Sequence, residues 1–313
     1  MHNEVYDFRK KPFKPHRADI IKTMKKVMII GSVHTDLVQY VRELPRGNEN
    51  AEVLKSETRT AGGGYASGSF FHKLGFPFQV ICDPGDGVYG EYARNEALQN
   101  EIELLEGSEE TGGCTYTLID QNGAQGVFLV DGSEYHFSLA QVYDISPDEF
   151  GAVLVYSEML VSEGSEEIID LLNEMEVPVY ICFSSRTAEI SSEMLEALCA
   201  FEPVMIMRDE EAYELCGRKA KSADEAAAIL NDMSKAPVII LMKNNDVLYL
   251  DAQTSWIAPA KQKLHTDTWA SAFAAAQMAG VDTKNGMMFA NENGASYDAE
   301  TMKQRLAGMI LHR

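Results

Sequence analysis

From about residue 150 to residue 250, short apolar segments alternate with segments of helical periodicity. The apolar segments are 152–156, 177–183, 204–207, 238–242 and 247–250. The helical segments between them are 164–175, 190–201, 209–216 and 222–233. Strands that lack a polar face are typical of a parallel sheet buried on both sides by helices. The alternation therefore predicts an α/β fold, and ligands of such sheets bind beyond the carboxyl ends of the strands.

Upstream of this alternation, the sequence predicts one buried strand and several exposed ones. Residues 25–31 form an apolar strand that ends in a glycine turn, whereas residues 37–44 alternate and residues 51–60 are rich in Thr and Glu. In residues 114–137, two β-rich runs flank the turn Asp120-Gln-Asn-Gly, which is a hairpin pattern. These segments predict a small exposed sheet in addition to the buried one.

The length of 313 residues suits one large α/β domain, and the net charge of −21 argues against nucleic acid and anionic membranes as partners. This charge is uneven, because residues 1–26 hold eight Lys and Arg against three Asp and Glu. Residues 1–23 also contain Pro12 and Pro15. We expect them to be a basic N-terminal extension, and residues 24–313 to form the domain.

Cysteine usage and hydropathy bear on the compartment. The five cysteines are dispersed, with no Cys-x-x-Cys pair and no His cluster nearby, which is typical of reduced thiols and gives no metal site. No apolar run approaches the length of a membrane span, and no signal-like apolar segment follows the basic N-terminus. We therefore expect a cytoplasmic protein.

Two stretches have features of a ligand site. In residues 61–75, three glycines precede a helix, and glycine lets a ligand approach backbone N–H groups closely. In residues 265–280, the polar run Thr-Asp-Thr precedes a helix made almost wholly of small or apolar residues, which indicates a buried helix. The N-terminus of such a helix is a favourable place for an anion.

Both stretches resemble signatures of the ribokinase-like (PfkB) carbohydrate kinases. That family reads Gly-Ser-x-x-x-Asp after its first strand and Ala-Gly-Gly-x-x-x-Asn before its first helix; Gly31-Ser-Val-His-Thr-Asp36 and Ala61-Gly-Gly-Gly-Tyr-Ala-Ser67 are similar. Its second signature, Asp-Thr-x-Gly-Ala-Gly-Asp-x-Phe, is similar to residues 265–273. The resemblance implies a ribokinase-like three-layer αβα sandwich with a mainly parallel central sheet.

The same resemblance implies a small β-sheet lid that covers the sugar, built from segments near 37–60 and 114–137. It implies a homodimer formed through this lid. It also implies phosphoryl transfer from ATP to a hydroxyl of a small-molecule sugar or nucleoside, with ATP and Mg²⁺ as cofactors. Such catalysis depends on positioning, charge stabilisation and one base that takes the hydroxyl proton.

The substrate half matches the family well. By position, Asp36 would bind substrate hydroxyls, and Gly62 and Gly63 would let the sugar approach the backbone. Ser67 stands where the family has Asn, and could make one hydrogen bond where Asn makes two.

The catalytic positions depart from the family. In an alignment without gaps, Ser271 occupies the position of the base, and a serine hydroxyl cannot accept that proton unaided. Thr268, Trp269 and Ala270 replace the Gly-Ala-Gly that keeps N–H groups accessible to the transferring phosphoryl group. The two larger side chains add bulk where the family has none.

Two neighbours of Ser271 are alternative bases, Asp267 and His265. A gapped alignment can pair Asp267-Thr268 with the Asp-Thr of the motif, but it deletes two residues of the anion loop. Neither alignment restores the catalytic site of the family.

The nucleotide half is altered as well. The family's Asn-x-x-Glu, which positions Mg²⁺ and phosphate through water, falls on Arg208-Asp-Glu-Glu211, so Glu211 is retained and Arg replaces Asn. The family's Thr-x-Gly-x-x-Gly turn beside the nucleotide falls on residues 241–246, which include Lys243 and Asp246 but no glycine. The base, the anion loop, the metal-linked Asn and the nucleotide turn all serve phosphoryl transfer. Changes at all four favour weakened kinase activity.

Two hypotheses of function follow. The first is a diverged sugar or nucleoside kinase, impaired by the loss of the usual base, in which Asp267 or a group of the substrate takes the proton. The second is a non-catalytic relative, a pseudokinase that retains a small-molecule pocket and acts as a sensor or assembly partner. Turnover of ATP would separate the two.

Overall fold

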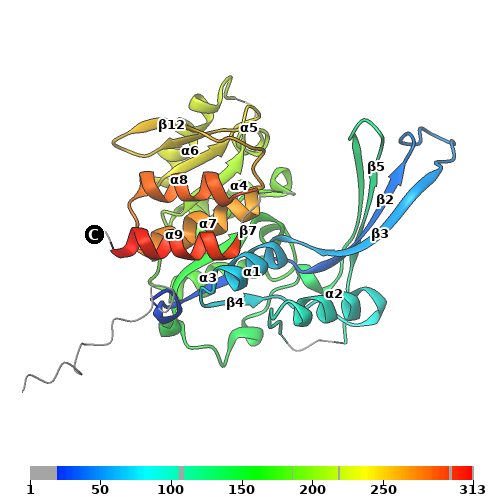
Figure 1. Cartoon of the computed structure of the whole chain (residues 1–313), viewed down its shortest axis with the longest axis horizontal. Coiled ribbons are helices and arrows are strands. Elements are labelled where there is room, and N and C mark those ends of the chain that lie inside the picture. The colour runs from blue at the N-terminus through cyan, green and yellow to red at the C-terminus, as the bar shows by residue number, and fades with distance from the viewer. Residues whose placement is uncertain (1–19, 106–108, 185, 218, 296–297, 312–313) are drawn as a thin grey trace, which may run out of the picture.

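The main sheet has eight strands in the order β12–β11–β10–β9–β8–β7–β1–β4 (Figure 1). The computed structural model describes residues 20–311 except 106–108, 185, 218, 296 and 297. The strands are β1 (Lys26–Ile30), β4 (Phe78–Ile81), β7 (Phe150–Tyr156), β8 (Val179–Cys182), β9 (Val204–Arg208), β10 (Val238–Leu241), β11 (Asp246–Leu250) and β12 (Ser255–Pro259). The first six of these run parallel, β11 runs antiparallel to β10, and the edge strand β12 runs antiparallel to β11.

Helices cover both faces of this sheet (Figure 1). One face packs against α1 (Gly63–Leu74), α7 (Thr266–Met278), α8 (Thr283–Asn293) and α9 (Ala299–Leu311). The other packs against α3 (Ser165–Glu174), α4 (Ser192–Cys199), α5 (Asp209–Leu215) and α6 (Ala223–Ser234). Along β1, Val27 and Ile29 face the first core and Met28 and Ile30 the second, because side chains alternate along a strand.

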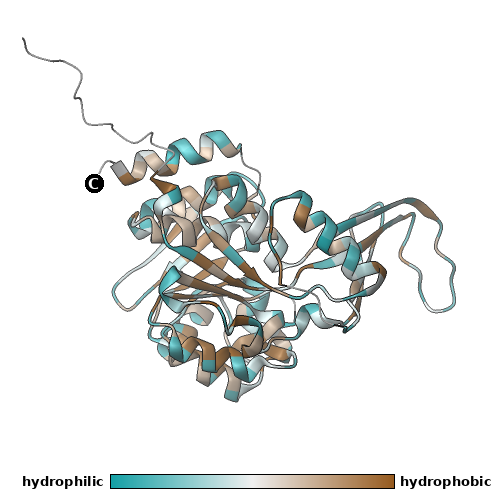
Figure 2. Cartoon of the chain, turned by 90° about the horizontal axis from the view of Figure 1, so that it is seen from below, coloured by the Kyte–Doolittle hydropathy of each residue, from teal (hydrophilic) through white to brown (hydrophobic). Residues whose placement is uncertain are grey.

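The prediction of a three-layer αβα sandwich is therefore confirmed. Seen from below, the strands of the main sheet are largely hydrophobic and the helices outside them are more hydrophilic (Figure 2). All four residues of β8 and of β10 are buried, which is the pattern of a parallel sheet covered on both faces.

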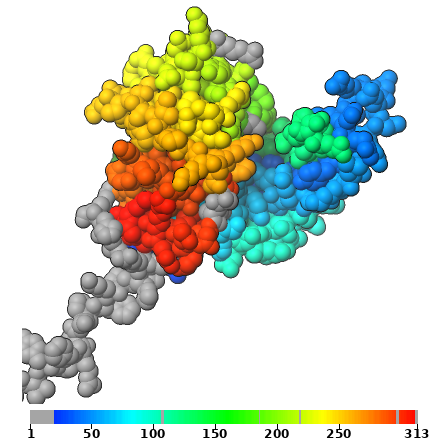
Figure 3. Space-filling view, turned by 45° about the horizontal axis from the view of Figure 1, so that its top comes forward, coloured from blue at the N-terminus to red at the C-terminus, as the bar shows by residue number. Residues whose placement is uncertain are grey.

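A second sheet of four strands, which we call the lid, projects from the body (Figures 1 and 3). It consists of β2 (His34–Val41), β3 (Val53–Ala61), β5 (Cys114–Ile119) and β6 (Gln125–Val130), in the order β3–β2–β5–β6. Helix α2 (Gly87–Gln99) packs on one face, where Thr35 Oγ1 donates to the carbonyl oxygen of Tyr89 at 2.7 Å. His34 and Asp36 lie on the opposite face, which we call the inner face.

Two segments differ from the sequence-based expectation. The hairpin ends at Val130, and residues 131–137 leave the lid through a 3₁₀ helix at Ser133–Tyr135. Most of the predicted N-terminal extension lies outside the described residues, but Ile21–Thr23 form a helical turn. Ile21 is 1% exposed, so the apolar end of that segment belongs to the core.

The strand order places a topological switch point between β1 and β7. From β1 the chain moves to β4 on one side, and later continues from β7 to β10 on the other side. Ser32 follows β1 and Tyr156 ends β7, so both lie at the carboxyl edge where ligands of α/β sheets bind.

Among the described residues, no helix has the length and apolar character needed to span a membrane.

Candidate active site

The glycines before α1 bring its N-terminus against the end of β1. Gly62 has a φ of +105°, and a Cβ there would lie 2.2 Å from the carbonyl oxygen of Ser32. A Cβ on Gly63 would lie 2.3 Å from Tyr156 Cδ1. Glycine is thus required at both positions for close packing within the chain, and the ring of Tyr156 occupies the space beside Gly63.

Three buried hydroxyl groups join α1, β7 and α7 next to these glycines. Ser67 Oγ lies 2.5 Å from Tyr156 Oη and 2.7 Å from Ser271 Oγ. Ser271 Oγ also donates to the carbonyl oxygen of Asp267, 2.8 Å away and one turn earlier in α7. Ser67 and Ser271 are both 0% exposed, so the structure brings them together as part of a closed network.

Helix α7 begins earlier than the aligned motif of the family implies. His265 is its N-cap, and the backbone N–H of Trp269 already donates to the carbonyl oxygen of His265 at 2.9 Å. The N–H groups of Thr266, Asp267 and Thr268 precede this first helical hydrogen bond. The N-terminus of α7 that can receive an anion is therefore residues 266–268 rather than 268–270.

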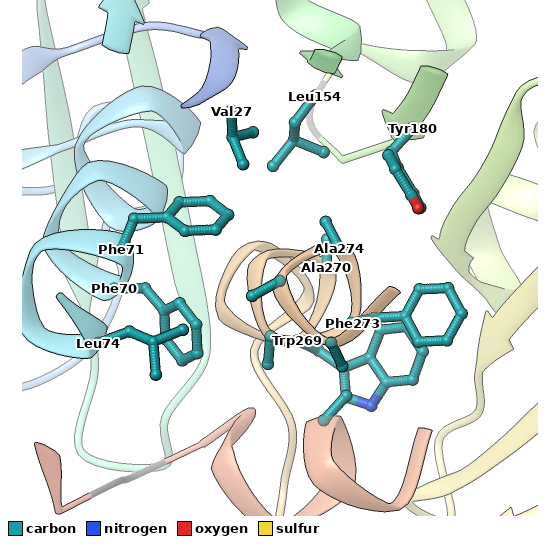
Figure 4. Close-up of a cluster of buried hydrophobic side chains, with 14 of the residues drawn as sticks. Val27, Phe70, Phe71, Leu74, Leu154, Tyr180, Trp269, Ala270, Phe273 and Ala274 are labelled. Carbon is teal, nitrogen blue, oxygen red and sulfur yellow. The ribbon is translucent and has the colours of Figure 1, made fainter. Parts of the chain in front are cut away.

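The side chains of Trp269 and Ala270 lie in the core, and both are 0% exposed. The Trp269 ring stacks on Phe273 with centroids 5.3 Å apart (Figure 4), and its Nε1 donates to Asn291 Oδ1 at 2.8 Å. Thr268 is half-buried at the helix start. The bulk of Trp269 therefore lies in the core and not at the start of the helix.

Asp267 lies in the first turn of α7, beyond the carboxyl ends of β7 and β8. Its Oδ1 is 3.8 Å from the buried thiol of Cys182, which donates to it. Burial raises the pKa of the Asp267 carboxyl, and the nearby charges of His265 and Arg208 oppose this rise. This carboxylate is therefore better placed to take a proton than the hydroxyl of Ser271.

Glu158 is a buried carboxyl that the sequence analysis missed. It is 3% exposed and accepts hydrogen bonds from Ser32 Oγ at 3.1 Å and Ser184 Oγ at 3.3 Å. Burial raises the pKa of Glu158 to about 7, and the charge of Asp267 adds to the rise. An acidic residue two positions after an apolar strand was the only signal in the sequence.

Asp36 lies on the inner face of the lid with all its acceptor positions in use. Thr115 and Thr117 donate to its Oδ1 at 2.7 and 2.8 Å, and Arg59 donates twice to its Oδ2 at 2.9 and 2.8 Å. Two residues earlier, His34 is 8% exposed and its Nδ1 has no hydrogen-bond partner in the described part of the chain.

Arg208 and Glu211 lie at the junction of β9 and α5. Glu211 Oε2 accepts from the backbone N–H of Arg208 at 2.9 Å, and burial raises the pKa of Glu211. The guanidinium of Arg208 donates to the carbonyl oxygen of Leu264 at 2.6 Å, directly before α7. A positive charge thus stands beside Asp267, where the family has a neutral Asn.

Lys243 lies in the turn between β10 and β11, and Asp246 is the first residue of β11. Lys243 Nζ forms an exposed ion pair with Glu210 Oε1 at 2.9 Å, and Asp246 Oδ2 accepts from Asn244 Nδ2 at 2.7 Å. The carbonyl oxygen of Asn245 accepts from the N–H of Ala260 at 3.1 Å. This last hydrogen bond joins the turn to residues 260–262.

A cavity of about 610 Å³ opens beside these residues. Its wall combines β12, residues 260–262 and α8, with apolar groups from Trp256 and Met288 and the amide of Asn291. The volume is within the range of small-molecule sites. Among the described residues, no group of three or more His, Cys, Asp or Glu side chains is arranged to hold a metal ion.

The sequence of this chain matches the model of one protein family. The sequence model described as pfkB family carbohydrate kinase matches residues 24–295. Among curated proteins, none matches the sequence. Solved structures do match, at sequence identities so low that they show the fold alone.

Three such structures illustrate the likeness. The ribokinase of Thermotoga maritima has a TM-score of 0.71 at 15% identity, covering 92% of this chain and 100% of its own. The ribokinase of Arabidopsis thaliana, solved with ribose and ATP, has a TM-score of 0.72 at 16% identity and covers 92% and 99%. A nucleoside kinase of Methanocaldococcus jannaschii has a TM-score of 0.67 at 15% identity and covers 93% and 99%.

Proposed function

Because this chain belongs to the pfkB family of carbohydrate kinases, we propose that it transfers a phosphoryl group from ATP to a sugar or nucleoside hydroxyl, at a low rate and with Asp267 as the base. The observation that supports this most is the position of Asp267. It lies in the first turn of a buried helix, at the carboxyl edge of the sheet, beside Glu158 and Cys182.

The surroundings of Asp267 suit a base. The positive end of the α7 dipole stabilises the carboxylate, and the guanidinium of Arg208 adds to this. Burial acts in the opposite direction and raises its pKa, which makes the carboxylate a stronger proton acceptor. Ser271 would hold this turn in place through its hydrogen bond to the carbonyl oxygen of Asp267.

At the phosphate end of the site, the groups that would bind phosphate oxygens differ from those of the family. The N–H groups of residues 266–268 and the guanidinium of Arg208 replace the family's glycine loop and Asn. A fixed guanidinium stabilises negative charge that develops on a transferred phosphoryl group. Fewer N–H groups are accessible than in a glycine loop, so we propose a low rate.

The cavity between β12 and α8 suits the base and ribose of a nucleotide. Its walls are apolar around Trp256 and Met288, with a polar group at Asn291. ATP would supply the transferred phosphoryl group. In such sites Mg²⁺ is held mainly by phosphates and water. One carboxylate, Glu211 at the junction of β9 and α5, would therefore be enough to position it, and a dedicated cluster of carboxylates is not required.

We extend the proposal to the partner, the dimer and the compartment. A sugar or nucleoside is supported by the ribose-bound ribokinase and the nucleoside kinase that share the fold. A homodimer through the lid is supported by edge strand β6, where Val127 and Phe128 are 59% and 61% exposed. A cytoplasmic location is supported by five free cysteines.

Two observations favour a second candidate, a relative that binds a small molecule without turnover. Asp36 has no acceptor position left for a substrate hydroxyl. The Tyr156 ring also fills the space beside Gly63. Both changes affect recognition of a neutral sugar more directly than the chemical step.

The test is ADP formation by the purified protein with a panel of sugars and nucleosides, with Mg²⁺ and with EDTA. A substrate-dependent rate that requires Mg²⁺ supports the kinase. A thermal-shift screen of the same compounds runs in parallel. Stabilisation by a sugar or nucleoside with no ADP above background supports the second candidate and contradicts the first.

A further inference from the structure

Asp36 serves the protein rather than a ligand. A carboxylate offers about four lone-pair positions, and Asp36 receives four hydrogen bonds, from Thr115, Thr117 and twice from Arg59. Its side chain is 4% exposed, whereas that of Arg59 is 54% exposed. The carboxylate therefore lies behind the guanidinium and fixes its orientation, while the outer part of the guanidinium faces solvent.

The guanidinium of Arg59 retains capacity for a further partner. Asp36 engages its Nε and Nη2, both through one oxygen. Its Nη1 has no hydrogen bond within the described residues. The next acidic residue on this face, Glu57, is already paired with Lys55 and accepts from Tyr40 Oη at 3.2 Å. Arg59 is thus the cation at this point of the inner face that can receive an external anion.

A buried nitrogen nearby lacks a partner. His34 precedes Asp36 by two residues on β2 and so lies on the same face, with its ring 6.0 Å from that of Tyr135. It is 8% exposed, and its Nδ1 has no hydrogen bond. A buried polar atom without a partner is uncommon and calls for a ligand or water group beside it.

We propose that the inner face of the lid binds an anionic group, a carboxylate or a phosphate, on Arg59, with Asp36 as its positioning residue and His34 bonding an adjacent polar group of the ligand. This inference rests on the proposed function, whose substrate class it narrows to a phosphorylated or carboxylated sugar. A planar guanidinium held by a carboxylate binds carboxylate and phosphate oxygens with two parallel hydrogen bonds.

The acidic composition does not oppose this site at close range. The net charge is −21, but exposed charges farther apart than about 10 Å are largely screened at moderate salt. The nearest acidic groups, Asp36 and Glu57, are each paired with a cation. The charges of these two pairs sum to zero, so a ligand anion that reaches Arg59 meets guanidinium N–H groups and no excess of negative charge.

The test is calorimetric binding of D-ribose, D-ribose 5-phosphate and D-ribonate to the full-length protein without ATP. We expect at least one anion to bind about tenfold more tightly than ribose, a preference that weakens as salt is raised. Preference for the phosphate assigns a phosphorylated sugar, and preference for ribonate assigns a sugar acid. Equal affinity of the three compounds, or no binding of either anion at millimolar concentration, would overturn the inference.

The matched control for Arg59→Ala is Arg42→Ala. Arg42 also lies on the lid, is 59% exposed and pairs with Glu52, at the far end of the same strand pair. Arg59→Ala should abolish the preference for the anion, and Arg42→Ala should keep it within about twofold. Equal losses in the two variants would mean that only the overall charge matters.

Arg59→Ala leaves the buried Asp36 without its cation and so could disturb the lid. The double variant Asp36→Asn/Arg59→Gln removes both charges while keeping polar groups that can bond each other. It should fold and also lose the preference. A folded double variant that keeps it contradicts the assignment. The binding experiment contains no ATP and is therefore independent of the ADP assay. An anion preference here together with no ADP formation there would refute the kinase proposal and leave the anion site standing.

Discussion

The hydroxyl oxygens of Ser67 and Ser271 lie 2.7 Å apart, although 204 residues separate them in the chain. In the alignment without gaps to the signatures of its family, the same two positions hold an Asn and the catalytic Asp. Here they fasten α1 to α7, with Tyr156 Oη 2.5 Å from Ser67 as the third member. At two positions where the resemblance implies contacts with substrate or catalysis, the side chains here bond to each other, and Ser271 supports the first turn of α7.

Ser271→Ala should lower the free energy of unfolding by about 1–3 kcal/mol, because it leaves buried hydrogen-bonding groups without a partner. Urea unfolding measures this directly. Ser255→Ala is the control, since Ser255 is exposed on edge strand β12, and it should change stability by no more than about 0.5 kcal/mol. Equal effects of the two substitutions would show that the Ser67–Ser271 bond contributes nothing.

Glu158 should make the protein less stable as pH rises. Burial raises the pKa of Glu158 in the folded state to about 7, above its ordinary value of 4.5, so the folded state holds this proton more tightly. Stability is therefore fully present below pH 4.5 and decreases as pH rises toward 7, by up to about 3 kcal/mol. Glu158→Gln should remove this decrease, as measured by urea unfolding across this range.

The control for Glu158→Gln is Glu176→Gln. Glu176 is exposed, so this variant should show the same dependence of stability on pH as the wild type. Profiles of the wild type and Glu158→Gln that run parallel from acid to neutral pH are incompatible with a protonated Glu158 in the folded state.

His34 should act in the opposite sense. Burial lowers the pKa of His34 in the folded state from 6.5 to about 4, so the unfolded chain binds the proton more tightly. This residue therefore lowers stability as pH falls from 6.5 toward 4, by about 3 kcal/mol at most. His34→Asn should abolish that loss, and His72→Asn, a less buried histidine, should not. A His34→Asn profile identical to that of the wild type would argue for a hydrated or charged His34.

The exposed apolar face of β6 predicts a concentration-dependent dimer. Phe128 is 61% exposed on an edge strand, and Val130, two residues later on the same face, is 47% exposed. Phe128→Glu should shift sedimentation from dimer to monomer with little change in the melting temperature of the fold. Met233→Glu, at a 40% exposed site on α6, is the control and should leave the association unchanged. A monomeric wild type excludes the lid as a dimer contact.

The body of the fold could be predicted from the sequence because its signals are local. The buried strands from β7 to β10 each read as a short apolar run, and the helices between them as amphipathic periods. The end of the lid hairpin at Val130 also had a local signal, because the turn-forming residues Asp131-Gly-Ser133 follow it; the expected hairpin ran past this signal to residue 137.

The site was less predictable because its contacts join distant segments. The saturation of Asp36 requires that β2 pair with both β3 and β5, which brings Arg59 and Thr115 to it. The Tyr156 ring beside Gly63 depends on packing of β7 against the start of α1. Neither relation has a signature in the spacing of residues along the chain.

The assignment of the base to Asp267 is the central claim, and Asp267→Asn tests it most directly. The measurement is the rate of substrate-dependent ADP formation, with the sugar or nucleoside that gives the wild type its highest rate. Asp232→Asn, at an 86% exposed carboxylate on α6, is the matched control. We predict a slow but Mg²⁺-dependent wild-type rate, an unchanged control, and a loss of about 100-fold or more in Asp267→Asn. An unaltered rate in Asp267→Asn, or no turnover by the wild type with any compound tested, would contradict the account.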